Sequence, residues 1–159
     1  MADLRDAFET LGYGDVQSYI QSGNVLFSGT GGRSALEDTI EQALETRFGF
    51  PVVVVVRTHR QMQNVVAKAP TGFGDDPATY YSDAIFLKDP LTAAAALAAV
   101  ERRDGVDEAW KGSGVLYFQR LGAERTKSRM GRIAGRPEYQ LMTIRSWTTT
   151  TKLLALLDA

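Results

Sequence analysis

The sequence predicts an α+β protein of two tandem ferredoxin-like (βαββαβ) halves, the first lacking its opening strand, followed by a C-terminal helix. Residues 1–57 have the pattern helix, strand, strand, helix, strand. Residues 83–159 have the pattern strand, helix, strand, strand, helix, strand, and a last helix. Residues 58–82 are expected to be a connecting helix and loop. The 159 residues are 44% hydrophobic and 23% charged, as in an ordinary globular chain.

The first half is expected to open with a helix and a hairpin. Apolar residues at helical spacing predict a helix over residues 2–11, which ends before Gly12. The runs 16–21 and 24–27 are rich in β-forming residues, and Gly23 between them can take the positive φ of a tight turn. These two runs therefore predict the hairpin.

A second helix and a strand complete the first half. Ser34 is the expected N-cap of a helix that ends at Gly49. Its apolar residues Leu36, Ile40 and Leu44 should pack on the sheet. The run Val52 to Val56 carries no charge, so it predicts a strand buried on both faces and among the most buried segments of the chain.

The second half repeats the pattern after a helix at 58–69 and a loop at 70–77. The elements expected in it are a strand at 84–87, a helix at 91–101, a hairpin pairing 106–110 with 115–118, a basic helix at about 126–134, a strand at 141–144 and a helix at about 147–157.

The composition excludes several classes of site. The chain has no cysteine and a single histidine, His59, which excludes disulfides, thiol nucleophiles, cysteine zinc sites and multi-histidine metal sites. We expect no metal site and no cofactor. No apolar run is long enough to span a membrane, and the first residues lack the order of a signal peptide. The sequence therefore predicts a cytoplasmic protein with no membrane partner.

Four motifs carry a family resemblance. They are the hairpin Tyr19-Ile20-Gln21-Ser22-Gly23-Asn24-Val25-Leu26-Phe27, Arg47-Phe48-Gly49-Phe50, Arg125-Thr126-Lys127-Ser128 and Thr143-Ile144-Arg145-Ser146-Trp147-Thr148-Thr149. Together they resemble the bacterial domain of unknown function 1697 family. The resemblance implies paired ferredoxin-like halves and no established biochemical role. Members of that family usually open with an apolar strand and a glycine-rich turn, so we expect a shortened N-terminus here.

The C-terminal quarter is the strongest candidate for a binding surface. Residues 120–159 carry a net charge of +5, whereas residues 1–119 carry −6. Six cations fall within 17 residues: Arg120, Arg125, Lys127, Arg129, Arg132 and Arg136. Such a stretch can bind a phosphate group or a nucleic-acid backbone, and it can equally be a solvated helix face. Arginine is favoured as a ligand because its forked guanidinium binds phosphate or carboxylate with two hydrogen bonds.

The candidate residues fall into two groups. Expected ligand-binding residues are Arg125, Lys127, Arg145, Trp147, Gln21, Ser22 and Asn24, and expected nucleic-acid-binding residues are Arg120, Arg129, Arg132 and Arg136. We expect Arg125, Lys127 and Arg145 to converge on one surface. The hairpin residues Gln21, Ser22 and Asn24 also fit ordinary turn chemistry, and Trp147 also fits a core position.

Three weaker candidates have simpler structural interpretations. His59 is a possible general base and an ordinary exposed residue of a first helical turn. The glycine-rich loop 28–34 is a possible anion cradle and an ordinary linker. Asp75 and Asp76, with Asp83, are possible cation ligands and ordinary loop residues.

Three functions remain open from the sequence. The leading one is binding of an anionic small molecule or nucleic acid by the C-terminal basic surface. The second is an enzyme that holds a phosphorylated or carboxylated substrate between the two halves. The third is a protein-interaction module, including a homodimer, that uses an unpaired sheet edge.

Overall fold

The chain divides into two compact units, Met1–Thr58 and His59–Ala159. A computed structural model describes residues 2–20 and 23–159. The helix expected to connect the halves lies inside the second unit, where it forms α3 (His59–Ala67). The predicted α+β class is confirmed, whereas the tandem ferredoxin-like arrangement stays a prediction.

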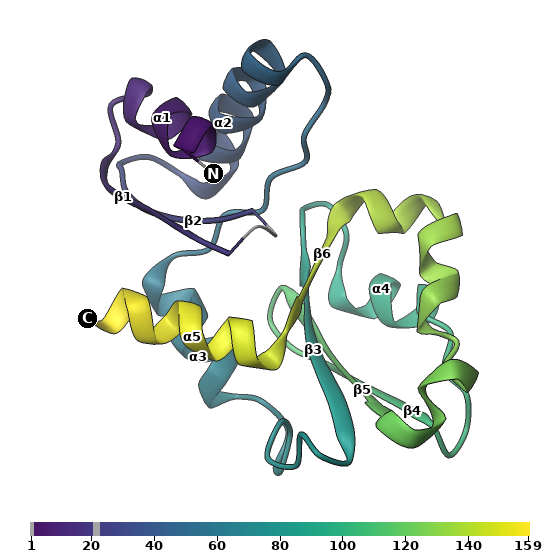
Figure 1. The fold of residues 1–159 in the computed structure, drawn as a ribbon. Helices are drawn as coiled ribbons and strands as arrows, with labels where there is room; N and C mark the ends of the chain where they lie inside the picture. The colour runs from purple at the N-terminus through teal and green to yellow at the C-terminus, as the bar shows by residue number, and fades with distance from the viewer. Residues whose placement is uncertain (1, 21–22) are drawn as a thin grey trace. The chain divides into compact units, whose positions relative to one another are not determined.

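The first unit is a hairpin covered by two helices (Figure 1). Its elements are α1 (Ala2–Thr10), β1 (Gly14–Tyr19), β2 (Asn24–Ser28) and α2 (Arg33–Phe48). Strands β1 and β2 pair antiparallel, as the two β-rich runs predict. The buried core comprises Ala7, Phe8, Val16, Ile40 and Leu44. The helices therefore bury their apolar stripes against one face of the hairpin.

Helix α2 ends as predicted but begins differently. Its last turn is closed by Gly49, which takes a φ of +80° and donates its backbone N–H to the carbonyl of Glu45 at 2.8 Å. The expected N-cap, Ser34, lies inside the helix, and Gly32 occupies the cap position without a side-chain hydrogen bond. The helix therefore begins at Arg33, directly after the glycine-rich loop and before the expected cap residue.

The predicted valine strand is wrong. Residues 51–58 form no strand, and Val53 is 48% exposed. The N–H groups of Val54 and Val56 donate to the carboxylates of Glu41 and Glu37 on α2, each at 2.9 Å, in place of the carbonyls of a neighbouring strand. Val52, Val54 and Val56 pack against the core, so the segment is extended with one face inward. It is not among the most buried parts of the chain.

The second unit is a four-stranded antiparallel sheet with helical elements on both faces. Its strands are β3 (Tyr80–Leu87), β4 (Asp107–Lys111), β5 (Val115–Leu121) and β6 (Met142–Ser146). The order across the sheet is β4-β5-β3-β6. The helices are α3, α4 (Ala93–Ala99) and α5 (Trp147–Asp158). None of the helices in the described residues combines the length and hydropathy needed to cross a membrane.

The predicted basic helix is a chain of three short 3-10 turns. They are η1 (Gly122–Lys127), η2 (Met130–Gly135) and η3 (Pro137–Leu141). Gly131 and Gly135 each cost about 1 kcal/mol relative to alanine in an α-helix, and Pro137 begins a new turn. A continuous helix therefore does not form across the basic residues.

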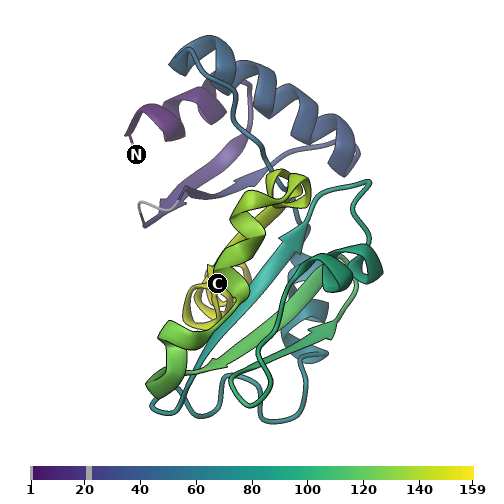
Figure 2. The same cartoon turned by 90° about the vertical axis from the view of Figure 1, so that its right-hand side faces the viewer.

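The two faces of the sheet are covered by different elements (Figures 1 and 2). On the first face, the buried core joins strands β3, β5 and β6 to α4 and η2, through residues such as Ile85, Phe118, Ala96 and Ile133. On the second face, α3 and α5 cover the sheet. There the hydroxyl of Tyr117 donates to the carbonyl of Val65 on α3 at 2.6 Å.

The loop before β3 is fixed to the second face by an aromatic group. Phe73 lies edge-on against Trp110, Tyr117 and Trp147, with ring centroids 5.9, 5.5 and 5.0 Å away. Gly74 follows with a φ of +77°, and a Cβ there would overlap the Trp147 ring. Gly72 has a similar φ of +81° but faces open space.

A strand added before residue 1 is expected to stabilise the protein. A nine- or ten-residue apolar strand can pair with the extended valine segment, burying several side chains at roughly 1.5–3 kcal/mol each before chain entropy is subtracted. Thermal melting of the two proteins measures the difference. Equal midpoints would show that the valine segment needs no strand partner.

Gly74→Ala is expected to destabilise the protein more than Gly72→Ala. Both variants carry the strain of a positive φ, about 1–3 kcal/mol, but only Gly74→Ala also forces the Trp147 ring to move, adding about 1–3 kcal/mol. The free energy of unfolding in urea separates the two contributions. Equal losses would mean that the Trp147 ring moves at no cost.

Candidate functional site

The strand register places the basic residues on different faces of the second sheet. Arg120 on β5 lies opposite Tyr81 on β3 and opposite Asp107 on β4. Directly paired residues of antiparallel strands share a face, here the first face. Arg145 lies opposite Ala84, which pairs with Tyr117 on the second face. The sheet therefore places Arg145 on the face opposite Arg120, whereas Arg125 lies at the Tyr81 ring on the side of Arg120, so the register does not support the expected convergence of Arg145 with Arg125.

Four side chains gather at the start of β3 on the first face. We call this group the Tyr81 cluster: Tyr81, Asp83, Arg120 and Arg125. The guanidinium carbons of Arg120 and Arg125 lie 5.6 and 5.7 Å from the centre of the Tyr81 ring. The Tyr81 residue is 42% exposed, so this part of the cluster faces solvent. Arg125 also donates from Nη1 to the carbonyl of Gly122 at 3.0 Å.

Asp83 and Arg120 form the inner part of the Tyr81 cluster. Nη1 of Arg120 lies 3.4 Å from Oδ2 of Asp83, and the side chains are 26% and 15% exposed. The same Nη1 lies 3.2 Å from the Met130 sulfur. Burial raises the pKa of the Asp83 carboxyl, and the positive charge of Arg120 opposes that rise. The pair is therefore held in a partly desolvated position.

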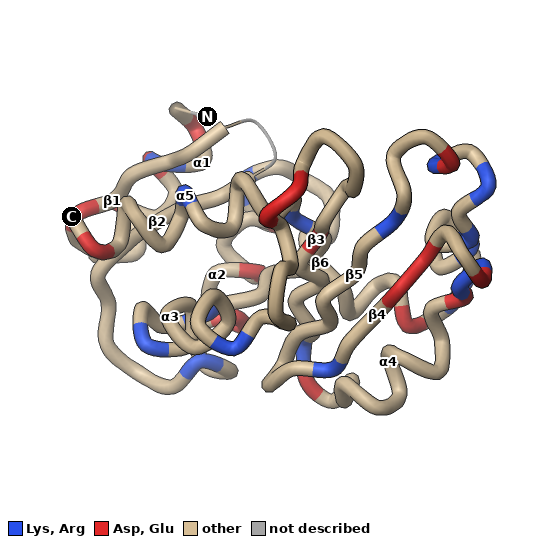
Figure 3. Tube along the Cα trace, turned by 90° about the horizontal axis from the view of Figure 1, so that it is seen from below, with Lys and Arg blue, Asp and Glu red and all other residues tan. Residues whose placement is uncertain are grey.

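Most cations of the basic stretch have carboxylate partners nearby. Lys127 pairs with Glu124 at 2.8 Å, and this contact lowers the pKa of Glu124. Arg132 pairs with Glu101 at 2.9 Å. Arg136 pairs with Glu138 at 3.2 Å. Figure 3 shows blue and red stretches next to each other on the side of the unit that carries α4 and β4.

Arg125 and Arg129 differ from the other cations of the stretch. Among the residues that the structure describes, neither guanidinium has a carboxylate partner. Arg129 Nε is buried and lacks a hydrogen-bond partner. These two arginines are therefore the cations of the stretch whose donors no carboxylate occupies in the described residues.

Asp107 holds the basic segment on the sheet. Its residue is 6% exposed, and its Oδ2 accepts the backbone N–H groups of Arg103 and Arg129, each at 2.9 Å. Sequence reasoning missed this residue, because its two partners lie 4 and 22 positions away and no local pattern marks them. Tyr81 was missed as well, since the adjacent Tyr80 and Tyr81 look like ordinary strand residues.

The other predicted ligand residues that the structure describes have structural contacts. Asn24 is buried and donates from Nδ2 to the carbonyl of Tyr19 at 3.1 Å, bridging the hairpin. Gln21 and Ser22 lie outside the described residues. Arg145 donates from Nη1 to the carbonyl of Ile144, and burial lowers the pKa of Arg145. Trp147 packs against Phe73 and Tyr117 on the second face. For these residues the binding role stays a prediction.

The weaker candidates are dispersed. His59 Nε2 lies 2.6 Å from Oδ1 of Asp158, joining the start of α3 to the end of α5. Asp75 and Asp76 are exposed loop residues, whereas Asp83 lies within β3. No three carboxylate or histidine side chains within residues 2–20 and 23–159 gather as metal ligands would.

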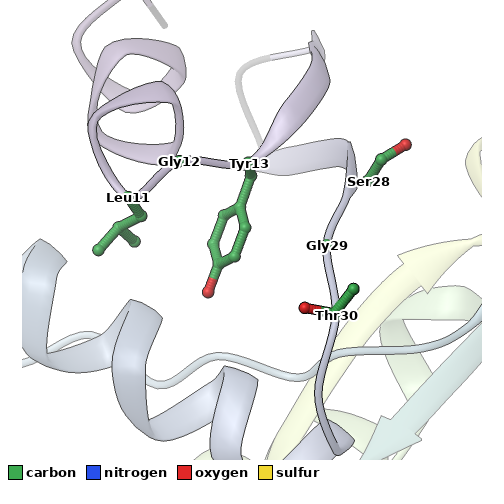
Figure 4. Close-up of a pocket in the computed structure, with 6 residues that line it drawn as sticks. All are labelled: Leu11, Gly12, Tyr13, Ser28, Gly29 and Thr30. Carbon is green, nitrogen blue, oxygen red and sulfur yellow. The ribbon is translucent and has the colours of Figure 1, made fainter.

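A hollow in the first unit offers different chemistry. It is lined by Leu11, Gly12, Tyr13, Ser28, Gly29 and Thr30. Figure 4 shows the Tyr13 ring reaching into the space between Leu11 and Thr30. A Cβ on Gly29 would lie 2.9 Å from the Tyr13 ring, so glycine permits the close approach. No lining residue carries a charge, and the hollow therefore suits an anion less well than the Tyr81 cluster.

Comparisons with known proteins identify a family and a fold. The model of the family described as "Protein of unknown function (DUF1697)" matches residues 1–117, which include Tyr81 and Asp83 but end before Arg120. No curated protein matches the chain. The structure of the conserved bacterial protein SP0830 from Streptococcus pneumoniae is similar, with a TM-score of 0.79 at 22% identity over 100% of this chain and 89% of that one. At this identity the likeness concerns the fold alone.

Proposed function

The chain belongs to the DUF1697 family of proteins of unknown function, and we propose that its second unit binds a phosphate-bearing ligand at the Tyr81 cluster and the adjacent Arg129. The observation that carries the proposal is the placement of Arg125. Its guanidinium lies over an exposed tyrosine ring and, in the described residues, donates to a carbonyl and to no carboxylate. A guanidinium group fixed in this way retains N–H donors for phosphate oxygens.

The fixed position of Arg125 favours binding. A free arginine loses side-chain entropy when it grips a ligand, about 0.5–1.5 kcal/mol for an immobilised side chain. Contact with the Tyr81 ring and the Gly122 carbonyl holds the side chain before the ligand arrives.

The proposed architecture for this site is the second of two ferredoxin-like halves. The order of elements β3, α4, β4, β5, β6 and the sheet order β4-β5-β3-β6 support that assignment for residues 80–146. Under this arrangement the phosphate site lies where β3 begins and β5 ends.

Removal of Arg125 and Arg129 is expected to weaken phosphate binding. The Arg125→Ala, Arg129→Ala double variant should bind a fluorescent oligothymidylate at least about tenfold more weakly than the wild type in low salt, as measured by anisotropy. Its slope of log affinity against log salt should fall by about 1.4, the value for two phosphate contacts on a single strand. Inorganic phosphate and thymidine monophosphate, used as competitors, distinguish a small-molecule site from a polymer site.

A matched double variant is the control for this experiment. Arg132→Ala, Arg136→Ala removes the same charge from the same segment, but from cations that have glutamate partners. It should change the affinity by no more than about twofold, since exposed ion pairs contribute little. Equal losses of affinity in both double variants would show that the effect comes from net charge alone. Absence of wild-type binding to all three probes would overturn the proposed function.

A second candidate function is self-association through the first unit. The observation that favours it is a pair of exposed large apolar side chains, Phe50 and Val53, close together in sequence at the start of the extended segment 51–58. Sedimentation velocity over a hundredfold range of concentration tests it, with Val53→Lys as the variant. We expect the average molecular mass of the wild type to rise with protein concentration, and that of Val53→Lys to be lower at the same concentration. A wild-type mass that stays at the monomer value would exclude this function.

A further inference from the structure

We infer that the Asp83 carboxylate is an internal counter-anion that competes with the ligand's phosphate for the Arg120 guanidinium. The inference deepens the proposed function, on which it rests, by assigning a regulatory contact to the same site. Asp83 occupies a position at Arg120 that a phosphate oxygen can take. The phosphate site is therefore partly filled by the protein's own carboxylate.

The geometry of the Arg120 contact supports exchange. At 3.4 Å, the Nη1 to Oδ2 distance lies well beyond the 2.7–2.9 Å typical of charge-assisted N–H···O bonds. The other contact of Nη1 is with the Met130 sulfur, a weak acceptor. A guanidinium has five donors, so this loose contact leaves Arg120 with capacity for a better oxyanion.

The position of Arg120 brings it to the same ligand as Arg125. Both guanidinium carbons lie within 6 Å of one ring, that of Tyr81. Under the proposal, a phosphate bound by Arg125 at the exposed edge of that ring is also within reach of Arg120, whose side chain is 26% exposed. Asp83 is the less exposed partner, at 15%, and its place on β3 is opposite Phe118, the next pair on the same face of the sheet after Tyr81 and Arg120.

The charge of Asp83 is costly to maintain. Burial raises the pKa of its carboxyl, so protonation begins at a higher pH than for an exposed aspartate. The charged and titratable groups near Asp83 and its partner Arg120 are Tyr81 on β3, Asp107 on β4 opposite Arg120, and Arg125 on η1. As the pH falls toward the Asp83 pKa, the carboxylate is neutralised and Arg120 becomes available to the ligand.

Asp83→Asn tests the competition. Asparagine keeps the shape and removes the charge, so the variant should bind oligothymidylate about tenfold more tightly than the wild type at neutral pH and low salt. The control is Glu108→Gln, which changes the net charge equally from an exposed position of β4 on the second face. Thymine does not gain a proton in mild acid, so the ligand keeps its charge. The affinity gap between wild type and Asp83→Asn should close as the pH is lowered from 7 toward 4.

Each outcome of the experiment decides the inference. A gain for Asp83→Asn that exceeds the gain for Glu108→Gln and disappears in acid supports it. Equal gains in affinity for both variants, with wild-type binding that still depends on Arg125, would refute the role of Asp83 as a counter-anion. The proposed function would then remain supported. Absence of binding by every protein overturns both. NMR of the arginine Nε–H groups in the wild type provides a test without the variant, because an Arg120 signal that does not move at saturating oligothymidylate also overturns the inference.

Discussion

The register of β3 is the constraint on which the second unit depends. As an inner strand with β5 on one side and β6 on the other, β3 fixes which side chains of all three strands share a face. A shift of one residue would exchange the two faces. It would bring Asp83 toward the aromatic side and move Arg145 to the side of Arg120. The composition of the Tyr81 cluster is therefore a property of strand pairing, rather than of the basic segment alone.

The basic segment is organised by buried contacts and not by helical regularity. Asp107 accepts the backbone N–H of Arg129 at the junction between η1 and η2, while Met130 and Ile133 enter the core of the first face. These anchors hold short 3-10 turns that have few internal hydrogen bonds of their own. The arginine side chains are presented from a backbone whose position is set by the sheet beneath it.

Local patterns in the sequence were sufficient for elements with local causes. The hairpin around Gly23 and the end of α2 at Gly49 follow from positive-φ glycines beside periodic apolar residues. The valine run shows the limit of this reasoning. Its composition predicts a strand buried on both faces, but strand formation requires a partner that composition does not reveal. Glu37 and Glu41, which bind its N–H groups, read as ordinary helix residues.

The candidate site was predictable only as a region. The excess of cations in residues 120–136 is visible in the sequence, and the two arginines that lack a carboxylate partner in the described residues lie within it. The partners that neutralise the other cations are not visible, since Glu101 and Asp83 are 31 and 37 residues away from the arginines they contact. Arg145 was misplaced for the same reason, because its face depends on register.

The pairing of neighbouring charges also sets how far the surface acts. Each glutamate beside Lys127, Arg132 and Arg136 cancels most of the field of its cation beyond a few ångströms, and the chain as a whole carries −1. Such a surface exerts little long-range electrostatic attraction on an anionic ligand in solution. Encounter then proceeds at the diffusional rate of unsteered partners, about 10⁵–10⁷ M⁻¹s⁻¹ for macromolecules, and selectivity arises from how long a ligand stays once it has arrived.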